Sequence, residues 1–260
     1  MGKTMRKRGQ ATVFAIVGIV IIILVALFFF LRNEFGFFVS PTTFLSEKSQ
    51  PIEDNLRGCV NEATRDALDI FSKQGGDFSP GNYRFYESRA VKYYCTNLPE
   101  TEQCLNVMPS FGELISTLNN RIQTDVNNCV DKDLVKSGLG YDIKAGEITT
   151  TVSASGSGLV VRSDYDVNIT KGENSYSVND IAVNYDAPIE DLYAVAVDIV
   201  NSEAQVGFFE QLLYMVGKRG QYIINLDKPY PDKIYKITKK DSDFEFWFAV
   251  EGERNLYGYF

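Results

Sequence analysis

The sequence predicts an α+β protein with one N-terminal transmembrane helix, followed by an ectodomain in which a disulfide-linked helix pair and an antiparallel β-sheet pack on helices. Three observations lead to this fold class: an uncharged apolar run near the N-terminus, two amphipathic helical stretches that each carry a cysteine, and a Thr- and Val-rich region that alternates with the period of strands. The predicted organisation is a basic cytoplasmic leader (1–9), the transmembrane helix (10–32), a linker (33–50), a helical disulfide-bonded region (51–140) and a β-sheet plus helix region (141–260).

The predicted transmembrane helix rests on residues 11–31, ATVFAIVGIVIIILVALFFFL, where Thr12 is the only polar residue. A helix of this length covers about 30 Å, the thickness of the hydrocarbon core of a bilayer. The run is longer than the apolar region of a cleaved secretory signal, and no small-x-small site follows it. A basic cluster precedes it (Lys3, Arg6, Lys7 and Arg8). We therefore expect a single-pass protein whose partner is the lipid bilayer, with the N-terminus cytoplasmic and the ectodomain extracellular.

The expected ectodomain is acidic. All 34 acidic residues follow the apolar run, with 22 of the 26 Lys and Arg residues, which gives this part a net charge near −12. Such a surface favours solubility and repels nucleic acid and anionic lipid. The charge balance therefore argues against a nucleic-acid partner.

Four cysteines lie in the ectodomain, which in an oxidising compartment indicates two disulfides. Cys59 lies on the apolar stripe of a predicted helix that begins near Pro51 and ends before Gly75-Gly76. Cys129 ends the stripe of a second helix that opens at a Ser110–Glu113 capping box. We therefore predict a Cys59–Cys129 bond between the helices and a Cys95–Cys104 bond in the segment that joins them.

The second half of the ectodomain reads as strands and helices. An apolar helix is expected from Asp186 and another apolar stretch over 208–216, and the end of the chain reads as short strands, the last of them Leu256–Phe260. A three-stranded antiparallel meander precedes these elements, with its strands at 147–153, 159–170 and 176–185. Asn168 begins a glycosylation sequon at the end of the middle strand, and we regard it as a glycosylation site.

Residues 77–108 read as an irregular aromatic and polar region. Sugars stack on aromatic rings, so this region offers a glycan-binding alternative, whereas the favoured interpretation is that the rings pack on the helix pair. The residues concerned are Tyr83, Phe85, Tyr86, Tyr93 and Tyr94.

The sequence indicates a protein that is not an enzyme and has no cofactor. It contains no histidine, the commonest general base and metal ligand, and no CxxC pair. It also lacks a phosphate-binding glycine loop and a G-x-S-x-G nucleophile motif. Catalytic and metal-binding residues are therefore predicted to be none, although acidic residues are numerous enough to leave a carboxylate-based envelope enzyme as a third possibility.

The N-terminal sequence Arg6-Lys7-Arg8-Gly9-Gln10, followed by the apolar run, resembles an archaeal class III (prepilin-type) signal. The resemblance covers about 25 residues. It implies cleavage between Gly9 and Gln10 by a prepilin-type peptidase, and self-association of the apolar helices as the core of a type IV filament. The chain departs from bacterial-type pilins in carrying Phe14 where they have glutamate, and Gly36 and Pro41 interrupt the predicted helix.

The wider layout also resembles single-pass surface proteins of small archaea, in which a cysteine-bearing helix ends in Gln-Gly-Gly, here Gln74-Gly75-Gly76, ahead of a β domain. We expect a pilin-like or membrane-anchored structural or adhesion protein of the cell surface. The alternative is a permanently anchored module that binds an extracellular ligand or glycan.

Overall fold

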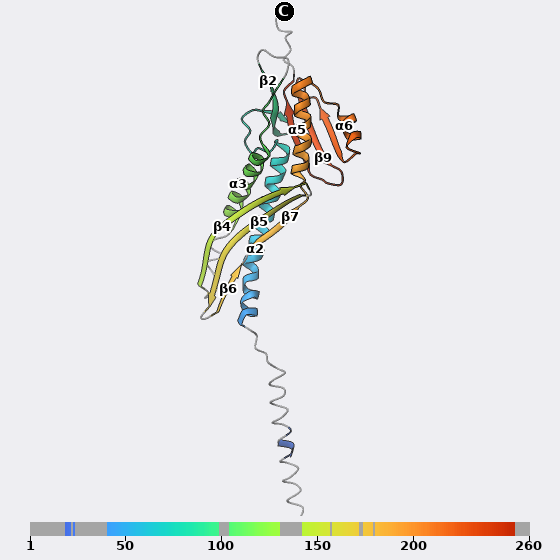
Figure 1. The fold of residues 1–260 in the computed structure, drawn as a ribbon. Helices are drawn as coiled ribbons and strands as arrows, with labels where there is room; N and C mark the ends of the chain where they lie inside the picture. The colour runs from blue at the N-terminus through green and yellow to red at the C-terminus, as the bar shows by residue number, and fades with distance from the viewer. Residues whose placement is uncertain are drawn as a thin grey trace, which may run out of the picture. The chain divides into compact units, whose positions relative to one another are not determined.

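The computed structural model describes residues 19–21, 23, 41–98, 104–130, 142–156, 158–171, 174–178 and 180–252. The chain divides into two compact units, Met1–Glu47 and Lys48–Phe260. In the first unit, Ile19, Val20, Ile21 and Ile23 are helical and exposed. The second unit carries both sheets (Figure 1).

Within the described part of the chain, no helix combines the length and the apolar character that a membrane crossing requires. The predicted fold class, with its transmembrane helix over residues 10–32, is wrong in this respect. The long helix that the structure does contain is α2 (Pro41–Lys73), which is amphipathic and places Glu53 and Arg57 in an ion pair at the surface. Most of residues 10–32 lie outside the described residues.

Helix α2 begins at Pro41, whereas the sequence places a linker at 33–50 and a helix start near Pro51. Pro51 therefore lies inside α2, where it lacks the N–H for one i→i−4 hydrogen bond. The helix ends as predicted: Gly75 and Gly76 take positive φ angles of 68° and 73°, and the Gly76 N–H donates to the Phe71 carbonyl at 2.8 Å. This turn directs the chain toward the first sheet.

Helix α3 (Phe111–Cys129) opens with the predicted capping box, since the Ser110 hydroxyl accepts from the Glu113 N–H and the Glu113 carboxylate accepts from the Ser110 N–H. Its predicted stripe is buried: Leu114, Leu118, Ile122 and Val126. The buried face of α2 packs in the same core and includes Leu56, Val60, Ala63, Ala67 and Phe71. The two stripes therefore meet as the periodicity predicts.

The first sheet has the strand order β1-β2-β10-β9-β8. The short strand β3 pairs with the last residues of β2, whereas β1 pairs with its first residues. The strands of this sheet are β1 (Tyr83–Tyr86), β2 (Arg89–Asn97), β3 (Cys104–Asn106), β8 (Tyr222–Asp227), β9 (Lys233–Lys239) and β10 (Glu245–Val250). The region expected to be irregular, 77–108, thus forms β1, β2 and β3. The sheet is mixed rather than wholly antiparallel, because β10 pairs with β2 in parallel.

The second sheet is the predicted antiparallel meander, with longer strands and its third strand divided in two. Strand β5 (Gly158–Lys171) pairs with β4 (Asp142–Ser155) on one side and with β6 (Asn174–Val178) and β7 (Ile181–Tyr185) on the other. These strands run alongside α2 and α3 in Figure 1. Side chains of α3 fix the edge of β4, since Asn119 accepts from the Val152 N–H at 2.8 Å and Gln123 donates to the Ile148 carbonyl at 2.8 Å.

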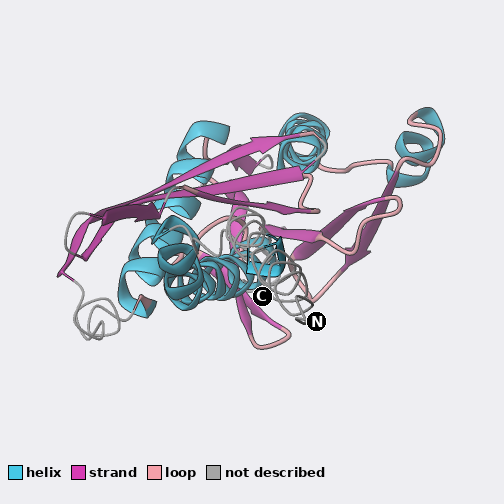
Figure 2. Cartoon of the chain, turned by 90° about the horizontal axis from the view of Figure 1, so that it is seen from below, coloured by secondary structure: helices cyan, strands magenta, loops and turns pink. Residues whose placement is uncertain are grey.

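Helix α5 (Ile189–Val206) joins the two sheets by packing against β4 of the second sheet and against β2, β3, β9 and β10 of the first. It begins where the sequence predicts, just after Asp186-Ala187-Pro188. A short helix, α6 (Gln211–Gly217), follows it and contacts β8. Seen from below, where α2 is viewed nearly end-on, the helices and strands of this unit lie side by side (Figure 2). One large apolar cluster holds them together.

Candidate functional site

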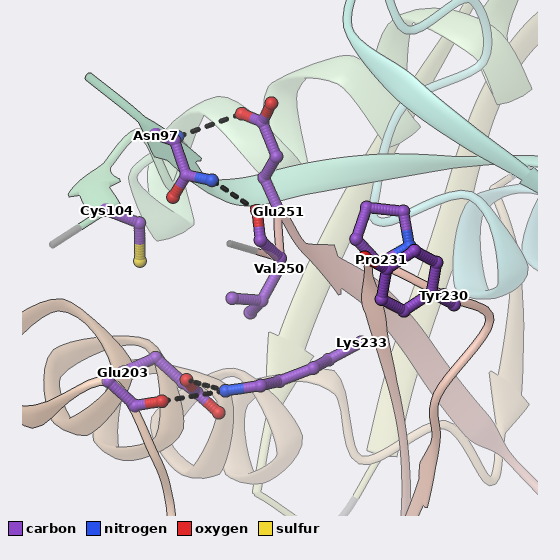
Figure 3. A pocket seen from close by; sticks show the side chains of 10 residues that line it. Asn97, Cys104, Glu203, Tyr230, Pro231, Lys233, Val250 and Glu251 are labelled. Carbon is purple, nitrogen blue, oxygen red and sulfur yellow. Dashed lines mark hydrogen bonds and ion pairs between the residues drawn. The ribbon is translucent and has the colours of Figure 1, made fainter. Parts of the chain in front are cut away.

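The candidate site is a pocket of about 260 Å³ between the end of α5 and the neighbouring ends of β2, β9 and β10. Figure 3 shows its labelled side chains, with Glu203 and Lys233 on one wall and Asn97 and Glu251 on another. Tyr230 and Pro231, joined by a cis peptide bond, form a third wall in the loop before β9. The pocket therefore gathers residues from distant parts of the sequence, 97–104 and 203–252.

A buried carboxylate lies at the wall formed by α5. Glu203 is 2% exposed, and its Oε2 accepts from the Lys233 ammonium at 2.6 Å. The Tyr235 hydroxyl donates to Oε1, and Lys233 also donates to the Gly207 carbonyl at 2.8 Å. Burial and the hydrogen bond to Glu203 raise the pKa of Tyr235 well above its ordinary value. Every oxygen of this carboxylate is thus engaged by a donor from β9.

A second buried carboxylate, Asp232, lies beside the pocket at the start of β9. The Tyr93 hydroxyl donates to it at 2.8 Å, Arg84 lies 3.2 Å away as an ion pair, and the Gly252 N–H donates to it at 3.0 Å. Burial and the hydrogen bond to Asp232 raise the pKa of the Tyr93 phenol. These contacts join β1, β2 and the end of β10 to the loop that holds Pro231.

The wall that carries Asn97 and Glu251 is held by polar contacts between β2 and the end of β10. The Asn97 N–H donates to Glu251 at 2.9 Å, the Asn97 side-chain amide donates to the Gly252 carbonyl, and the Glu251 N–H donates to the Cys95 carbonyl at 2.9 Å.

The chemistry of the pocket is that of a satisfied polar network. A general base needs a carboxylate with a free lone pair directed at a substrate, whereas Glu203 and Asp232 accept from cations and hydroxyls of the protein itself. No group of three His, Cys, Asp or Glu residues capable of holding a metal ion occurs among the described residues. The arrangement fixes the ends of β2, β9 and β10 to α5 and to one another.

The four cysteines form two disulfides, Cys59–Cys129 and Cys95–Cys104. The first is called the long-range disulfide below and the second the short-range disulfide. This is the pairing that the sequence predicts. The environments differ from the expectation in one respect, since Cys59 is 2% exposed whereas Cys129, at the end of α3, is exposed rather than on a buried stripe. Cys104 also lines the pocket.

The remaining predicted site residues lie elsewhere. Gly9 and Gln10 fall outside the described residues. Asn168 lies three residues before the end of β5, where it is paired with Lys144 and Ser177. Its amide nitrogen, the atom that would carry a glycan, donates to Asp166 at 3.1 Å, and its oxygen accepts from the Ser177 hydroxyl at 2.8 Å.

The aromatic residues considered for glycan binding separate into two groups. Tyr94 is fully buried and stacks on Phe248 with ring centroids 5.0 Å apart, and Tyr86 and Tyr93 donate to the carboxylates of Asp227 and Asp232. Tyr83 and Phe85 on β1 are 48% and 68% exposed. Packing thus accounts for the first three rings, and the last two remain accessible.

On the first sheet, the Lys236 ammonium lies over the rings of Tyr86 and Trp247. The Lys236 ammonium lies 4.5 Å from the Trp247 ring and 4.9 Å from the Tyr86 ring, and 2.9 Å from carboxylate oxygens of Glu87 and Asp227. Although burial disfavours the cation, these carboxylates raise the pKa of Lys236. These two rings and two carboxylates are therefore engaged by a side chain of the protein itself.

The buried Glu203 was not singled out from the sequence, although one signal pointed to it. It continues the apolar stripe of α5 at the i+3 position after Val200, where a charged residue is unusual. Its partners Lys233 and Tyr235 carried no comparable signal, because strand alternation alone does not show which strand faces α5.

No family model matches the chain, and no curated protein or solved structure is significantly similar to it. The functional conclusion therefore comes from the residues themselves.

Proposed function

We propose that the protein is an exported structural or adhesion protein of the cell surface, held there through its uncharged apolar segment 11–31, which serves as a membrane anchor or as the core of a pilin-like filament. The pair of disulfides carries this proposal. Cytosolic thiols are kept reduced, whereas secreted domains are stabilised by such bonds. All four cysteines are bonded, and the long-range disulfide joins positions 70 residues apart.

Two further features support a non-enzymatic role. The carboxylates at the pocket serve as internal ion-pair and hydrogen-bond partners, which suits a rigid head. The acidic balance of the chain, 34 acidic against 26 basic residues, suits solubility outside the cell and opposes contact with nucleic acid. The resemblance of residues 6–31 to prepilin-type signals favours processing at Gly9–Gln10 by a prepilin-type peptidase.

A glycan- or ligand-binding module is the second candidate, and the exposed rings of β1 favour it. Tyr83 and Phe85 present two rings on an edge strand, and Arg84 between them donates to the carbonyl of Tyr230, which is 70% exposed. Exposed aromatic rings are the elements on which sugars stack. Loss of glycan binding in a Phe85→Ala variant that retains both disulfides is the expected result for this candidate.

The test is the intact mass of the full chain recovered from fractionated native cells after alkylation without reduction. We expect the protein in the membrane or surface fraction with no cysteine alkylated. A chain that starts at Gln10 indicates prepilin-type processing, and one that starts at Met1 indicates a permanent anchor. Recovery from the cytosol with four alkylated cysteines would refute the proposal.

The filament form has its own test. A charge within the apolar segment, Val20→Asp, should abolish filaments and leave the disulfides of the head intact, because apolar segments that assemble must bury themselves in one another. Filaments formed by this variant would exclude the segment as a filament core.

A further inference from the structure

Strand β4 lies at one end of the strand order of the second sheet, with β5 as its neighbour on the inner side. An edge strand presents backbone N–H and C=O groups with which a strand of another molecule can pair. Next to α3, three groups of β4 are directed away from β5: the Ile148 carbonyl, the Thr150 N–H and the Val152 N–H. These are the groups that an added strand would use.

Two amide side chains of α3 bind these groups in place of a strand. Asn119 accepts from the Val152 N–H at 2.8 Å. Gln123 accepts from the Thr150 N–H and donates to the Ile148 carbonyl at 2.8 Å. The spacing suits this pairing, because four residues of a helix rise about 6 Å and two residues of a strand about 6.7 Å. Helix α3 therefore runs antiparallel to β4 along its edge, and the two lie side by side in Figure 1.

The covered stretch of β4 has the composition of a segment that pairs with itself. Residues 148–155 read ITTTVSAS, with no charge, proline or glycine, and five of the eight are β-branched. When such a segment is exposed, it pairs with identical segments of other chains. The composition therefore favours a second copy of this chain as the partner of an uncovered β4.

We propose that α3 covers the edge of β4 through Asn119 and Gln123, and that this contact prevents β4 from pairing with β4 of a second copy. The buried side chains Leu118 and Ile122 hold the helix in the core, and the two amides supply the hydrogen bonds that a second copy would otherwise supply. Without the amides, three backbone groups in a half-buried place lose their partners, which favours displacement of α3 by water or by another strand. This inference concerns the head alone and does not rest on the proposed cell-surface role.

The first test removes both amides in the purified full chain in neutral detergent, with Asn119→Ala and Gln123→Ala together. Backbone hydrogen exchange in residues 148–153 should become roughly fivefold faster, the factor that one net hydrogen bond gives. Light scattering should show association that increases with protein concentration. The matched control is Asn120→Ala with Asn128→Ala, two exposed amides of the same helix, which should change neither measurement. Unchanged exchange in the test variant, or faster exchange without association, would overturn the proposal.

The second test identifies the surface that associates. Thr151 is exposed and pairs with Arg162 of β5, so Thr151→Glu is compatible with the sheet but places a charge on the edge strand, where charges oppose pairing between molecules. Added to the double variant, Thr151→Glu should restore the mass that light scattering gives for the unchanged chain. Association that persists would place the contact elsewhere and overturn the proposal.

A milder variant serves where the double variant does not fold. Gln123→Ala alone frees two of the three backbone groups, and the same expectations hold for it, with the same outcomes against the proposal. None of these results alters the mass and alkylation pattern that test the proposed function.

Discussion

Replacing Lys233 by methionine tests whether the charged residues of the pocket stabilise the fold. Lys233 Nζ lies 2.6 Å from Glu203 Oε2, and the Glu203 side chain is 2% exposed while that of Lys233 is 24% exposed. Removing one member of a buried pair leaves an uncompensated charge, which typically costs about 3–5 kcal/mol. Because Lys233 is partly accessible and Tyr235 still donates to Glu203, we expect about 3 kcal/mol of lost stability in Lys233→Met.

A second variant separates the loss of the charge pair from the loss of packing. Glu203→Gln keeps an oxygen that accepts from the Tyr235 hydroxyl but removes the negative charge. In the double variant Lys233→Met and Glu203→Gln no buried charge remains, so we expect it to recover at least about 2 kcal/mol relative to Lys233→Met alone. Lys228→Met, at an exposed lysine in the loop before β9, serves as the control and should change stability by less than about 0.5 kcal/mol.

The assay is urea-induced unfolding of the full chain in detergent, followed by tryptophan fluorescence. The chain contains one tryptophan, Trp247, which is 5% exposed in β10 and reports directly on the first sheet. A cost below about 1 kcal/mol for Lys233→Met, or a double variant no more stable than the single one, would refute the reasoning. In that case Glu203 would be available for a ligand rather than committed to the fold.

Three further predictions concern the same unfolding measurement. Replacing both cysteines of the long-range disulfide by alanine should cost about 4 kcal/mol and those of the short-range disulfide about 2.5 kcal/mol, from loops of 70 and 9 residues; equal losses would contradict the loop-entropy estimate. Gly76→Ala should cost about 2–4 kcal/mol, because φ is 73° and a Cβ would lie 2.0 Å from the Leu114 side chain; a neutral substitution would show that this turn relaxes. Lys73 and then Arg89 lower the pKa of Asp69 in the folded protein. The free energy by which Asp69 stabilises the fold is therefore fully present above the ordinary pKa of an aspartate, and it is lost as the pH falls through the lowered pKa. The free energy of unfolding that the protein loses between about pH 4 and pH 3 should therefore be smaller in Asp69→Asn, by less than about 1 kcal/mol. The control Asp66→Asn, on the same helix, should lose as much stability over this range as the unchanged protein. Identical pH profiles for the two variants would contradict the assignment to Asp69.

Local patterns predicted the helices and the disulfides well. The stripe of α3 and its Ser110–Glu113 box use contacts between residues three and four positions apart, and the structure reproduces both. The turn at Gly75-Gly76 follows from backbone geometry that glycine adopts without a steric cost. Once two helices each carry a cysteine near a shared apolar face, few pairings remain compatible with their packing.

The same local patterns missed β1, β2 and β3. Strand β2 is stabilised by β10, whose residues Ala249 and Val250 pair with Tyr93 and Cys95, more than 150 positions earlier in the chain. Strands β1 and β2 form a hairpin whose two-residue turn is Glu87-Ser88, both at positive φ, and this dipeptide lacks the Asn-Gly or Asp-Gly signature by which such turns are recognised. The start of α2 also differs, since the helix begins at Pro41 and continues through the start signal at Pro51.

The sequence by itself determined the two amphipathic helices, the cysteine pairing, the antiparallel meander and the acidic balance of the chain, because each depends on neighbours or on composition. Only the tertiary structure decided the mixed first sheet, the burial of Glu203 beneath Lys233 and Tyr235, and the exposure of the apolar residues of α6. These features depend on which surfaces meet after distant segments pair. A periodic stripe shows that one side of an element is apolar, and the packing of the whole chain determines whether that side is covered.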